Sequence, residues 1–443
     1  MTLPERPRDL AETPDDLPEP PEDLVEGDRV ELRVGAPAHG GHCVARLGGP
    51  HGRVVFVRHA LPGELVTAEV TELHRGYLRA DAVRVHEPSP DRVAPPCPWA
   101  RPGACGGCDL QHVAEDAQRG WKAAVVREAL TRIGGLPADT LDALGVRVEP
   151  LPGGPLGWRT RVRYAVDAAG RAGLLQHRSH QVVPIDRCRI AHPLLQDLDV
   201  TARSWPDADA VEVVASTGGD VSVAVRRAAS APLPPDNSGT DGPGGARTQL
   251  TGPALVREVA AGRDWQVPAE GFWQVHPAAA DTLVTAVLEL LRPAPGEIAW
   301  DLYGGAGLFA AAVAERTGAR TTVVESSPTG VAAARANLAD LSGVEVVAAK
   351  VDVALARRRV TGPVDLVVLD PPRTGAGAKV VRSVAAARPR AVAYVACDPV
   401  ALARDVATFA AAGWRLARLR AFDCFPMTQH VECVALLLPD GPH

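Results

Sequence analysis

The 443-residue chain lacks long apolar runs, a secretory leader and, almost entirely, lysine. No run reaches the roughly 18 apolar residues that a transmembrane helix needs, so we expect no membrane partner. The first 26 residues contain no apolar segment of the kind found in signal peptides, which predicts a cytoplasmic chain with reduced cysteines. Only three of the 47 basic residues are lysine. Because genome composition explains an arginine excess as readily as phosphate recognition does, this bias alone does not indicate a partner.

The chain also lacks the positive charge that is typical of nucleic-acid-binding proteins, since its net charge is −6. The deficit lies in residues 1–26, which hold nine acidic residues, two arginines, six prolines and no aromatic residue. This composition predicts a disordered acidic tail. The rest of the chain has 45 basic and 44 acidic residues, which gives a net charge of +1. Divided in this way, the charge is compatible with an RNA partner.

The length predicts about three domains. Residues 27–90 contain short Val- and Leu-rich strands between Gly-rich turns, which predicts an OB-like β-barrel. Residues 91–270 predict a mixed α/β central domain, interrupted by a Pro- and Gly-rich flexible insertion at 228–247. Residues 271–443 alternate helices with apolar strands, the pattern of a doubly wound, Rossmann-like α/β domain.

A glycine-rich turn follows the first apolar strand of the C-terminal domain. It reads Asp-Leu-Tyr-Gly-Gly-Ala-Gly over residues 301–307, and Glu325 ends the next strand. Glycines allow a tight turn close to a ligand, and a carboxylate at Glu325 suits a ribose. Because Gly305, Gly307 and Ala310 also fit a dinucleotide fingerprint, the turn by itself leaves S-adenosylmethionine and NAD open.

Two further strands of this domain end in reactive or polar residues. Asp370 follows "VDLVVLD" and precedes two prolines, and Cys397 follows "AVAYVA". Ligands bind at the carboxyl ends of such strands, which favours an acceptor at Asp370 and a nucleophile at Cys397. The alternatives are a simple strand-ending turn and a passive cysteine. Cys424 and Cys433 are predicted to lie in the core.

Four other cysteines have the spacing of a metal site. These are Cys97, Cys105, Cys108 and Cys188. Four thiolates suit zinc or an iron–sulfur cluster. The sequence lacks the second Cys-x2-Cys pair of a zinc ribbon, which favours [4Fe–4S], and unliganded thiols are the remaining alternative.

Taken together, the motifs resemble the uracil-5 RNA methyltransferases that carry an N-terminal TRAM domain and an iron–sulfur cluster. The resemblance covers residues 28–440, with 28–88 similar to the TRAM domain and 97–111 with Cys188 similar to the cluster motif. The remaining family motifs occur in the family's order as "GFWQVHP" (271–277), "DLYGGAGLF" (301–309), "DPPRTGAG" (370–377), "ACDP" (396–399) and "HVEC" (430–433).

The resemblance implies a role for individual residues. Cys397 matches the family's nucleophile and Glu432 its proton-abstracting base. The positions that match contacts to S-adenosylmethionine are Gln274, Tyr303, Glu325, Asp352 and Asp370.

This chain departs from the family pattern at several of these motifs. The family often has "DLFCG" where this chain has "DLYGG", and Asn or Thr at Leu308, so a side-chain contact to the cofactor is in doubt there. "SCNP" is common where this chain has "ACDP", and the charge of Asp398 opposes thiolate formation at Cys397. The first cysteine spacing, x7, exceeds the x5 of the family.

The resemblance implies methylation of uracil C5 in RNA through a covalent cysteine adduct, by a monomeric enzyme. The architecture favours 23S ribosomal RNA, with transfer RNA as the alternative. An RNA cytosine-5 methyltransferase would be expected to have a Pro-Cys or Thr-Cys nucleophile motif and no cluster, whereas Cys397 follows Ala396. A radical methylthiotransferase is disfavoured because Cys-x3-Cys-x2-Cys is missing. A catalytically silent RNA-binding protein is disfavoured by Cys397 and Glu432. The Arg-rich stretch 151–190 predicts either phosphate contacts or a solvated strand face.

Overall fold

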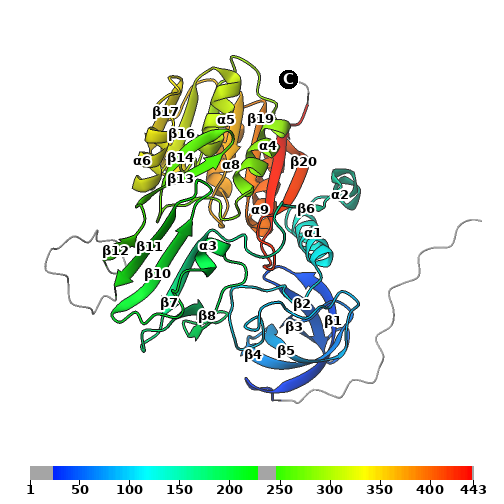
Figure 1. Cartoon of the computed structure of the whole chain (residues 1–443). Helices are drawn as coiled ribbons and strands as arrows, with labels where there is room; N and C mark the ends of the chain where they lie inside the picture. The colour runs from blue at the N-terminus through cyan, green and yellow to red at the C-terminus, as the bar shows by residue number, and fades with distance from the viewer. Residues whose placement is uncertain (1–22, 228–245, 442–443) are drawn as a thin grey trace, which may run out of the picture. The chain divides into compact units, whose positions relative to one another are not determined.

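The computed structural model describes residues 23–227 and 246–441. Most of the predicted acidic tail (1–26) and most of the predicted insertion (228–247) lie outside the described residues. The chain forms two compact units, drawn in Figure 1. One holds the described residues up to Ala94 with His112–Ala114, and the other holds the remainder. Among the described residues, no helix is both long enough and apolar enough to cross a membrane.

The first unit is a closed five-stranded barrel with the order β1-β2-β3-β5-β4. Its strands are β1 (Arg29–Ala38), β2 (His42–Leu47), β3 (Arg53–Arg58), β4 (Leu65–Leu73) and β5 (Tyr77–Glu87). Alternate residues of β1, namely Val30, Leu32 and Val34, are buried inside the barrel, as the period of a strand requires. The predicted OB-like barrel is therefore confirmed.

The second unit begins with a mainly antiparallel region. A six-stranded sheet has the order β12-β11-β10-β7-β8-β9, and β13 and β14 form a separate hairpin. The elements are β7 (Arg161–Val166), β8 (Ala172–Leu175), β9 (Val182–Pro184), α3 (Pro193–Gln196), β10 (Ala208–Ala215), β11 (Val221–Arg227), β12 (Arg247–Thr251), β13 (Leu255–Ala260) and β14 (Arg263–Pro268). Trp158, Tyr164 and Ile190 are buried in the core of this region.

The other sheet of this unit has eight strands in the order β17-β16-β15-β18-β19-β21-β20-β6. They are β6 (Val148–Pro150), β15 (Ala299–Leu302), β16 (Thr321–Glu325), β17 (Val344–Ala348), β18 (Leu366–Leu369), β19 (Ala391–Ala396), β20 (Trp414–Asp423) and β21 (Glu432–Pro439). The helices are α1 (Glu115–Arg132), α2 (Ala138–Leu144), α4 (Ala279–Leu291), α5 (Leu308–Thr317), α6 (Pro328–Asn337), α7 (Val351–Ala356), α8 (Gly377–Ala387) and α9 (Pro399–Ala411). Every residue of β15, β18 and β19 is buried, which explains why these strands are apolar at every position except Asp301.

The predicted Rossmann-like methyltransferase fold is confirmed, with one refinement of the sheet. The strands β17, β16, β15, β18 and β19 are parallel, but β21 and β20 form an antiparallel hairpin beside β19. The short β6 pairs with β20, and α1 contributes to the core on one face of the sheet. Two elements of the predicted central domain (91–270) are therefore part of this layer of the structure, β6 as a strand of the sheet and α1 as a helix packed on it. The domain boundary near residue 270 stays a prediction.

Candidate active site

Four of the sequence-predicted residues lie at the carboxyl ends of neighbouring parallel strands. Tyr303 follows β15, Glu325 ends β16, Asp370 follows β18 and Cys397 follows β19. The strands are in register, because Leu302 pairs with both Val324 and Leu369. The carboxyl ends of adjacent parallel strands form one edge of a sheet, and β15 is a switch point in the strand order. The four residues therefore share one crevice edge.

Glu432 reaches the same edge from the opposite chain direction. It is the first residue of β21, which runs antiparallel to β19 and pairs Cys433 with Ala396. Cys397 directly follows Ala396 and Glu432 directly precedes Cys433, so the two residues lie close together where this strand pair ends. The charge of Glu432 accordingly raises the pKa of the Cys397 thiol.

Cys397 is a free, partly buried thiol in an environment that opposes its ionisation. Its pKa is raised to about 12, first by burial and then by the negative charges of Glu432 and Asp370, while Arg373 lowers it. An ordinary cysteine has a pKa near 8.5, so the group is a thiol at neutral pH. A nucleophilic role at Cys397 requires a positive charge to enter the site.

Two carboxyl groups beside Cys397, on the partly buried Asp370 and the buried Glu432, are adapted to such a positive charge. Burial raises the pKa of Asp370 to about 7, and the charge of Asp301 adds to the effect. Burial raises the pKa of Glu432 well above its ordinary value, with Asp370 adding to it and Arg373 opposing it. A bound cation favours the charged form of nearby carboxylates and so lowers these pKa values. The edge therefore suits a positively charged ligand.

The glycine-rich turn after β15 brings backbone close to this edge. Tyr303 has φ +70°, and Gly305 and Gly307 have φ +54° and +95°. A Cβ at Gly304 would lie 2.5 Å from Val323, so only glycine fits there. Tyr303 adopts an unusual conformation for a bulky residue, which is typical of functional sites.

Two carboxylates hold the turn. Glu325 accepts a hydrogen bond from the backbone N–H of Gly305 at 3.0 Å, and Asp301 accepts one from Ala310 at 2.9 Å. Asp301 is 1% exposed, and burial raises its pKa to about 7. The sequence motif of the turn begins at Asp301 but does not mark it as a residue that holds the turn. The available signal is a carboxylate within an otherwise apolar strand, since burial of such a group is costly unless it is hydrogen-bonded.

The loop after Asp370 is also anchored by a buried acid. Asp405 of α9 accepts hydrogen bonds from Tyr394 Oη at 2.6 Å and from the backbone N–H of Ala376 at 2.8 Å. A Cβ at Gly375 would lie 2.8 Å from the Asp405 carboxylate. Asp405 and Tyr394 thus fix the "DPPRTGAG" loop, and no sequence motif had marked either residue.

The two other predicted cofactor residues have different surroundings. Asp352 is exposed on α7, and its charge raises the pKa of Tyr303, after the larger effect of burial. Gln274 is buried in the loop before α4. That loop is held by Thr160, whose N–H and hydroxyl both donate to the Val275 carbonyl at 2.9 Å. The role of Gln274 stays a prediction.

One arginine of the stretch 151–190 has a structural role. Arg161 pairs with Glu258 at 3.0 Å and donates to the carbonyl oxygens of Ala269 and Gly271, each at 3.0 Å. Its guanidinium supports the segment that leads to Gln274. Contact with a phosphate is therefore not the role of Arg161.

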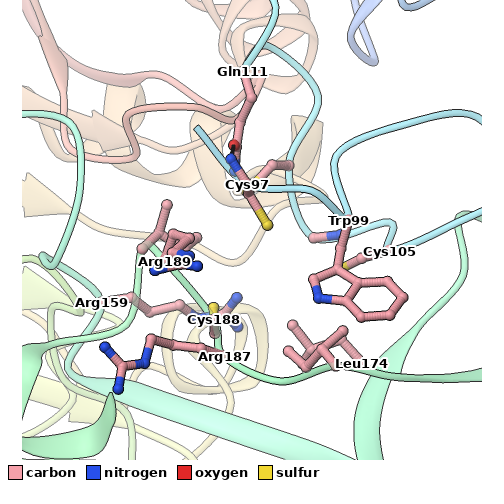
Figure 2. A pocket seen from close by; sticks show the side chains of 13 residues that line it. Cys97, Trp99, Cys105, Gln111, Arg159, Leu174, Arg187, Cys188 and Arg189 are labelled. Atoms are coloured by element: carbon pink, nitrogen blue, oxygen red, sulfur yellow. Dashed lines mark hydrogen bonds between the residues drawn. The ribbon is translucent and has the colours of Figure 1, made fainter. Parts of the chain in front are cut away.

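The four predicted metal-binding cysteines line one hollow in the second unit, and all four are free thiols. They are Cys97, Cys105, Cys108 and Cys188. Figure 2 shows the sulfur atoms of Cys97 and Cys188 directed into the hollow. Three arginines line it as well, namely Arg159, Arg187 and Arg189. The pKa of Cys105 is raised to about 11, chiefly by burial. The charges of Cys188 and Cys97 also raise this pKa, whereas the Gly107 N–H and Arg159 lower it.

The thiols do not form the coordination shell of a single ion. Over residues 23–227 and 246–441, no three Cys, His, Asp or Glu side chains are grouped so that they could hold a metal ion. Tetrahedral zinc requires ligands at roughly 2.0–2.3 Å. The hollow therefore gathers the donors without the geometry of a zinc site.

Comparison with known proteins extends over nearly the whole chain. A model described as the TRAM domain matches residues 24–83, and one described as tRNA (Uracil-5-)-methyltransferase matches 261–439. An uncharacterized RNA methyltransferase of Streptomyces avermitilis is 48% identical over 430 residues, which is 93% of this chain and 99% of that relative. A relative of the same description from Streptomyces coelicolor is 48% identical, with 93% of each chain covered. The solved structure of Pyrococcus abyssi tRNA (uracil-54, C5)-methyltransferase in complex with S-adenosyl-L-homocysteine is 25% identical, with a TM-score of 0.67, and covers 92% of this chain and 100% of that one.

Proposed function

The chain belongs to the TRAM-domain uracil-5 RNA methyltransferase family and is a methyltransferase dependent on S-adenosylmethionine; from this premise we propose that it forms 5-methyluridine in 23S ribosomal RNA. The observation that carries the proposal is that Glu432 and Asp370 lie close enough to Cys397 for their charges to raise the pKa of its thiol, at the end of the β19–β21 pair. We further propose that it works in the cytoplasm as a monomer. Transfer RNA is the second candidate, because the solved relative acts on it.

The chemistry explains why these residues are needed. Uracil C5 is a weak nucleophile. After the Cys397 thiol has lost its proton to solvent, its sulfur adds to C6, and the C5–C6 π electrons move into the C4 carbonyl as an enolate. C5 then forms a bond to the methyl group while the bond between that methyl group and the sulfonium sulfur breaks, which leaves a neutral thioether. Glu432 removes the C5 proton and the S–C6 bond breaks, which restores the C5–C6 double bond and the thiolate.

The site supports this sequence through charge. S-adenosylmethionine supplies the methyl group as an electrophile and carries a positive sulfonium, which favours ionised carboxylates nearby. Asp370, Glu325 and Tyr303 are proposed to orient it from the strand ends. Arg373 lowers the pKa of both Cys397 and Glu432. The target uracil must leave its stack at a cost of a few kcal/mol, which is smallest in single-stranded or loop RNA.

Mapping of 5-methyluridine tests the substrate. In a strain that lacks this protein, mass spectrometry of 23S ribosomal RNA should show one uridine in place of 5-methyluridine, and the plasmid-borne gene should restore the methyl group. Transfer RNA from the same strain is the matched control. Loss of the methyl group from transfer RNA alone would replace the ribosomal assignment with the second candidate.

A substitution beside the nucleophile should alter the pH dependence of the reaction. Asp398 caps α9 by accepting a hydrogen bond from Ala401 at 2.7 Å, and its charge is among those that raise the pKa of Cys397. Asp398→Asn keeps the capping oxygen and removes the charge, so the pKa of Cys397 should fall. We expect a few-fold faster methyl transfer at neutral pH and a pH–rate profile displaced to lower pH, measured in single turnovers.

Asp398→Ser, which is also a neutral helix cap, should displace the profile in the same direction. A profile that stays in place in both variants would mean that the charge of Asp398 does not act on the thiol.

We propose that Cys97, Cys105, Cys108 and Cys188 hold a [4Fe–4S] cluster. A cluster is bound by thiolates at its corners, which lie farther apart than the ligands of one ion, and the four thiols line a single hollow. The three arginines that line the hollow would balance the negative charge of the thiolates. Methyl transfer needs no electron, so the cluster would supply structure or RNA positioning.

Anaerobic purification tests the cluster. The protein should be brown and contain about four iron atoms per chain, and Cys108→Ser should lower the iron content and the visible absorption together. Cys43→Ser, at a buried cysteine of the barrel, is the matched control and should keep the iron. Stoichiometric zinc without iron would contradict the assignment.

A further inference from the structure

The loop between β20 and β21, residues 424–431, leads directly into Glu432 and is held by two buried polar side chains of α1. Gln118 is 1% exposed and Lys122 is fully buried. The two lie about one helical turn apart, so they share a face of α1. Burial of an amide and an ammonium group is costly unless both groups form hydrogen bonds. Here the hydrogen-bond partners lie in this loop and at Asp423, the residue that precedes it.

Gln118 holds the middle of the loop at Met427. Its Oε1 accepts a hydrogen bond from the Met427 N–H at 2.9 Å, and its Nε2 lies 3.3 Å from the Met427 sulfur. Met427 has φ +67°. A residue with a long side chain keeps this conformation only where its surroundings impose it. Gln118 thus stabilises a strained turn five residues before Glu432.

Lys122 holds the entry to the loop. Its ammonium group donates to Asp423 at 2.5 Å and to the Phe425 carbonyl at 3.0 Å. Asp423 directly follows Phe422, the β20 residue that pairs with Glu432. Lys122 therefore fixes the strand end that faces Glu432.

The cysteine-bearing segment binds the same turn from another direction. The N–H groups of Asp109 and Leu110 both donate to the Met427 carbonyl at 3.0 Å, and the Asp109 carboxylate accepts from the Gln429 N–H at 3.1 Å. These residues directly follow Cys108. Met427 is thus bonded through its N–H to α1 and through its carbonyl to the cysteine segment.

We propose that Gln118 and Lys122 are positioning residues for Glu432, acting through the 424–431 loop, and that the backbone at 109–110 shares this task. The proposal rests on the proposed function. Cys397 is carried by a different loop, between β19 and α9. Loosening the 424–431 loop should therefore slow removal of the C5 proton while sulfur addition and methyl transfer continue.

The test uses the full-length protein, its RNA substrate and a methyl donor labelled on the methyl group. Gln118→Met keeps the volume and removes the acceptor for Met427, whereas Gln118→Glu keeps an acceptor oxygen. Glu297→Gln is the matched control, because Glu297 pairs with Arg390 at the amino ends of the strands. Denaturing gels measure the methyl-labelled covalent adduct, and released RNA measures turnover.

In Gln118→Met we expect several-fold more adduct at steady state, several-fold slower turnover and single-turnover methyl transfer within about twofold of wild type. Gln118→Glu should turn over faster than Gln118→Met, because it keeps an acceptor for the Met427 N–H. Glu297→Gln should behave as wild type. Adduct and turnover that fall together, or an unchanged adduct level, would overturn the proposal. If Gln118→Met does not fold, Asp109→Ala, which removes the acceptor for the Gln429 N–H and so loosens the same loop, is judged by the same two readouts. Absence of adduct in Glu432→Gln would instead mark failure of the covalent mechanism itself.

Discussion

Replacement of Cys397 by alanine should lower methyl transfer to RNA by at least about a thousandfold, since no other group at the site can add to C6. The only other cysteines on neighbouring elements, Cys424 and Cys433, are fully buried in the core, as the sequence predicted. Binding of S-adenosylmethionine should stay within a few-fold of wild type. Single-turnover transfer of a labelled methyl group and calorimetric titration with the cofactor measure the two quantities.

Cys43→Ala is the matched control for this experiment. Cys43 is a buried free cysteine of the barrel, far along the chain from the strand ends that carry the site. Its loss should leave methyl transfer nearly intact. Turnover at the normal rate by Cys397→Ala would exclude the covalent mechanism.

The second large effect is expected at the base. Glu432→Gln keeps the size of the side chain but cannot accept the C5 proton, so product release should slow by about 10²–10⁴-fold. Because sulfur addition and methyl transfer precede that step, the methylated RNA should remain bound to Cys397. A band of enzyme joined to labelled RNA on a denaturing gel would report it.

The double variant Cys397→Ala with Glu432→Gln should give no such band, which identifies the sulfur that forms the bond. Glu345→Gln, at an exposed acid of β17, is the matched control and should release product as wild type does. Rapid product release by Glu432→Gln would show that another group removes the proton.

The fold was largely readable from local patterns. The barrel strands alternate buried and exposed residues, whereas β15, β18 and β19 are apolar at every position except Asp301 because both faces of the sheet are covered. The alternating pattern and the continuous apolar pattern are enough to distinguish a small barrel from a doubly wound sheet. What the patterns did not reveal was that β6 pairs with β20, since a strand of three residues carries no signal for its partner.

The site was partly readable for a similar reason. A polar residue at the end of an apolar strand is visible in the sequence, and Tyr303, Glu325, Asp370 and Cys397 all have this position. Asp301, Asp405 and Tyr394 were passed over as site residues because a buried residue that holds a loop resembles any other residue of a strand or helix. Gln118 and Lys122 were hidden within an ordinary helical pattern.

By itself, the sequence determined the barrel, the parallel sheet and the family, and it predicts Cys397 as the nucleophile and Glu432 as the base. Only the tertiary structure decided that Glu432 lies close to Cys397, because this depends on β21 running antiparallel beside β19. It also decided that the cysteine-bearing segment and α1 both form hydrogen bonds to the 424–431 loop, which precedes Glu432. Local composition and spacing specify elements and their end residues, whereas the pairing of distant segments depends on how those elements pack.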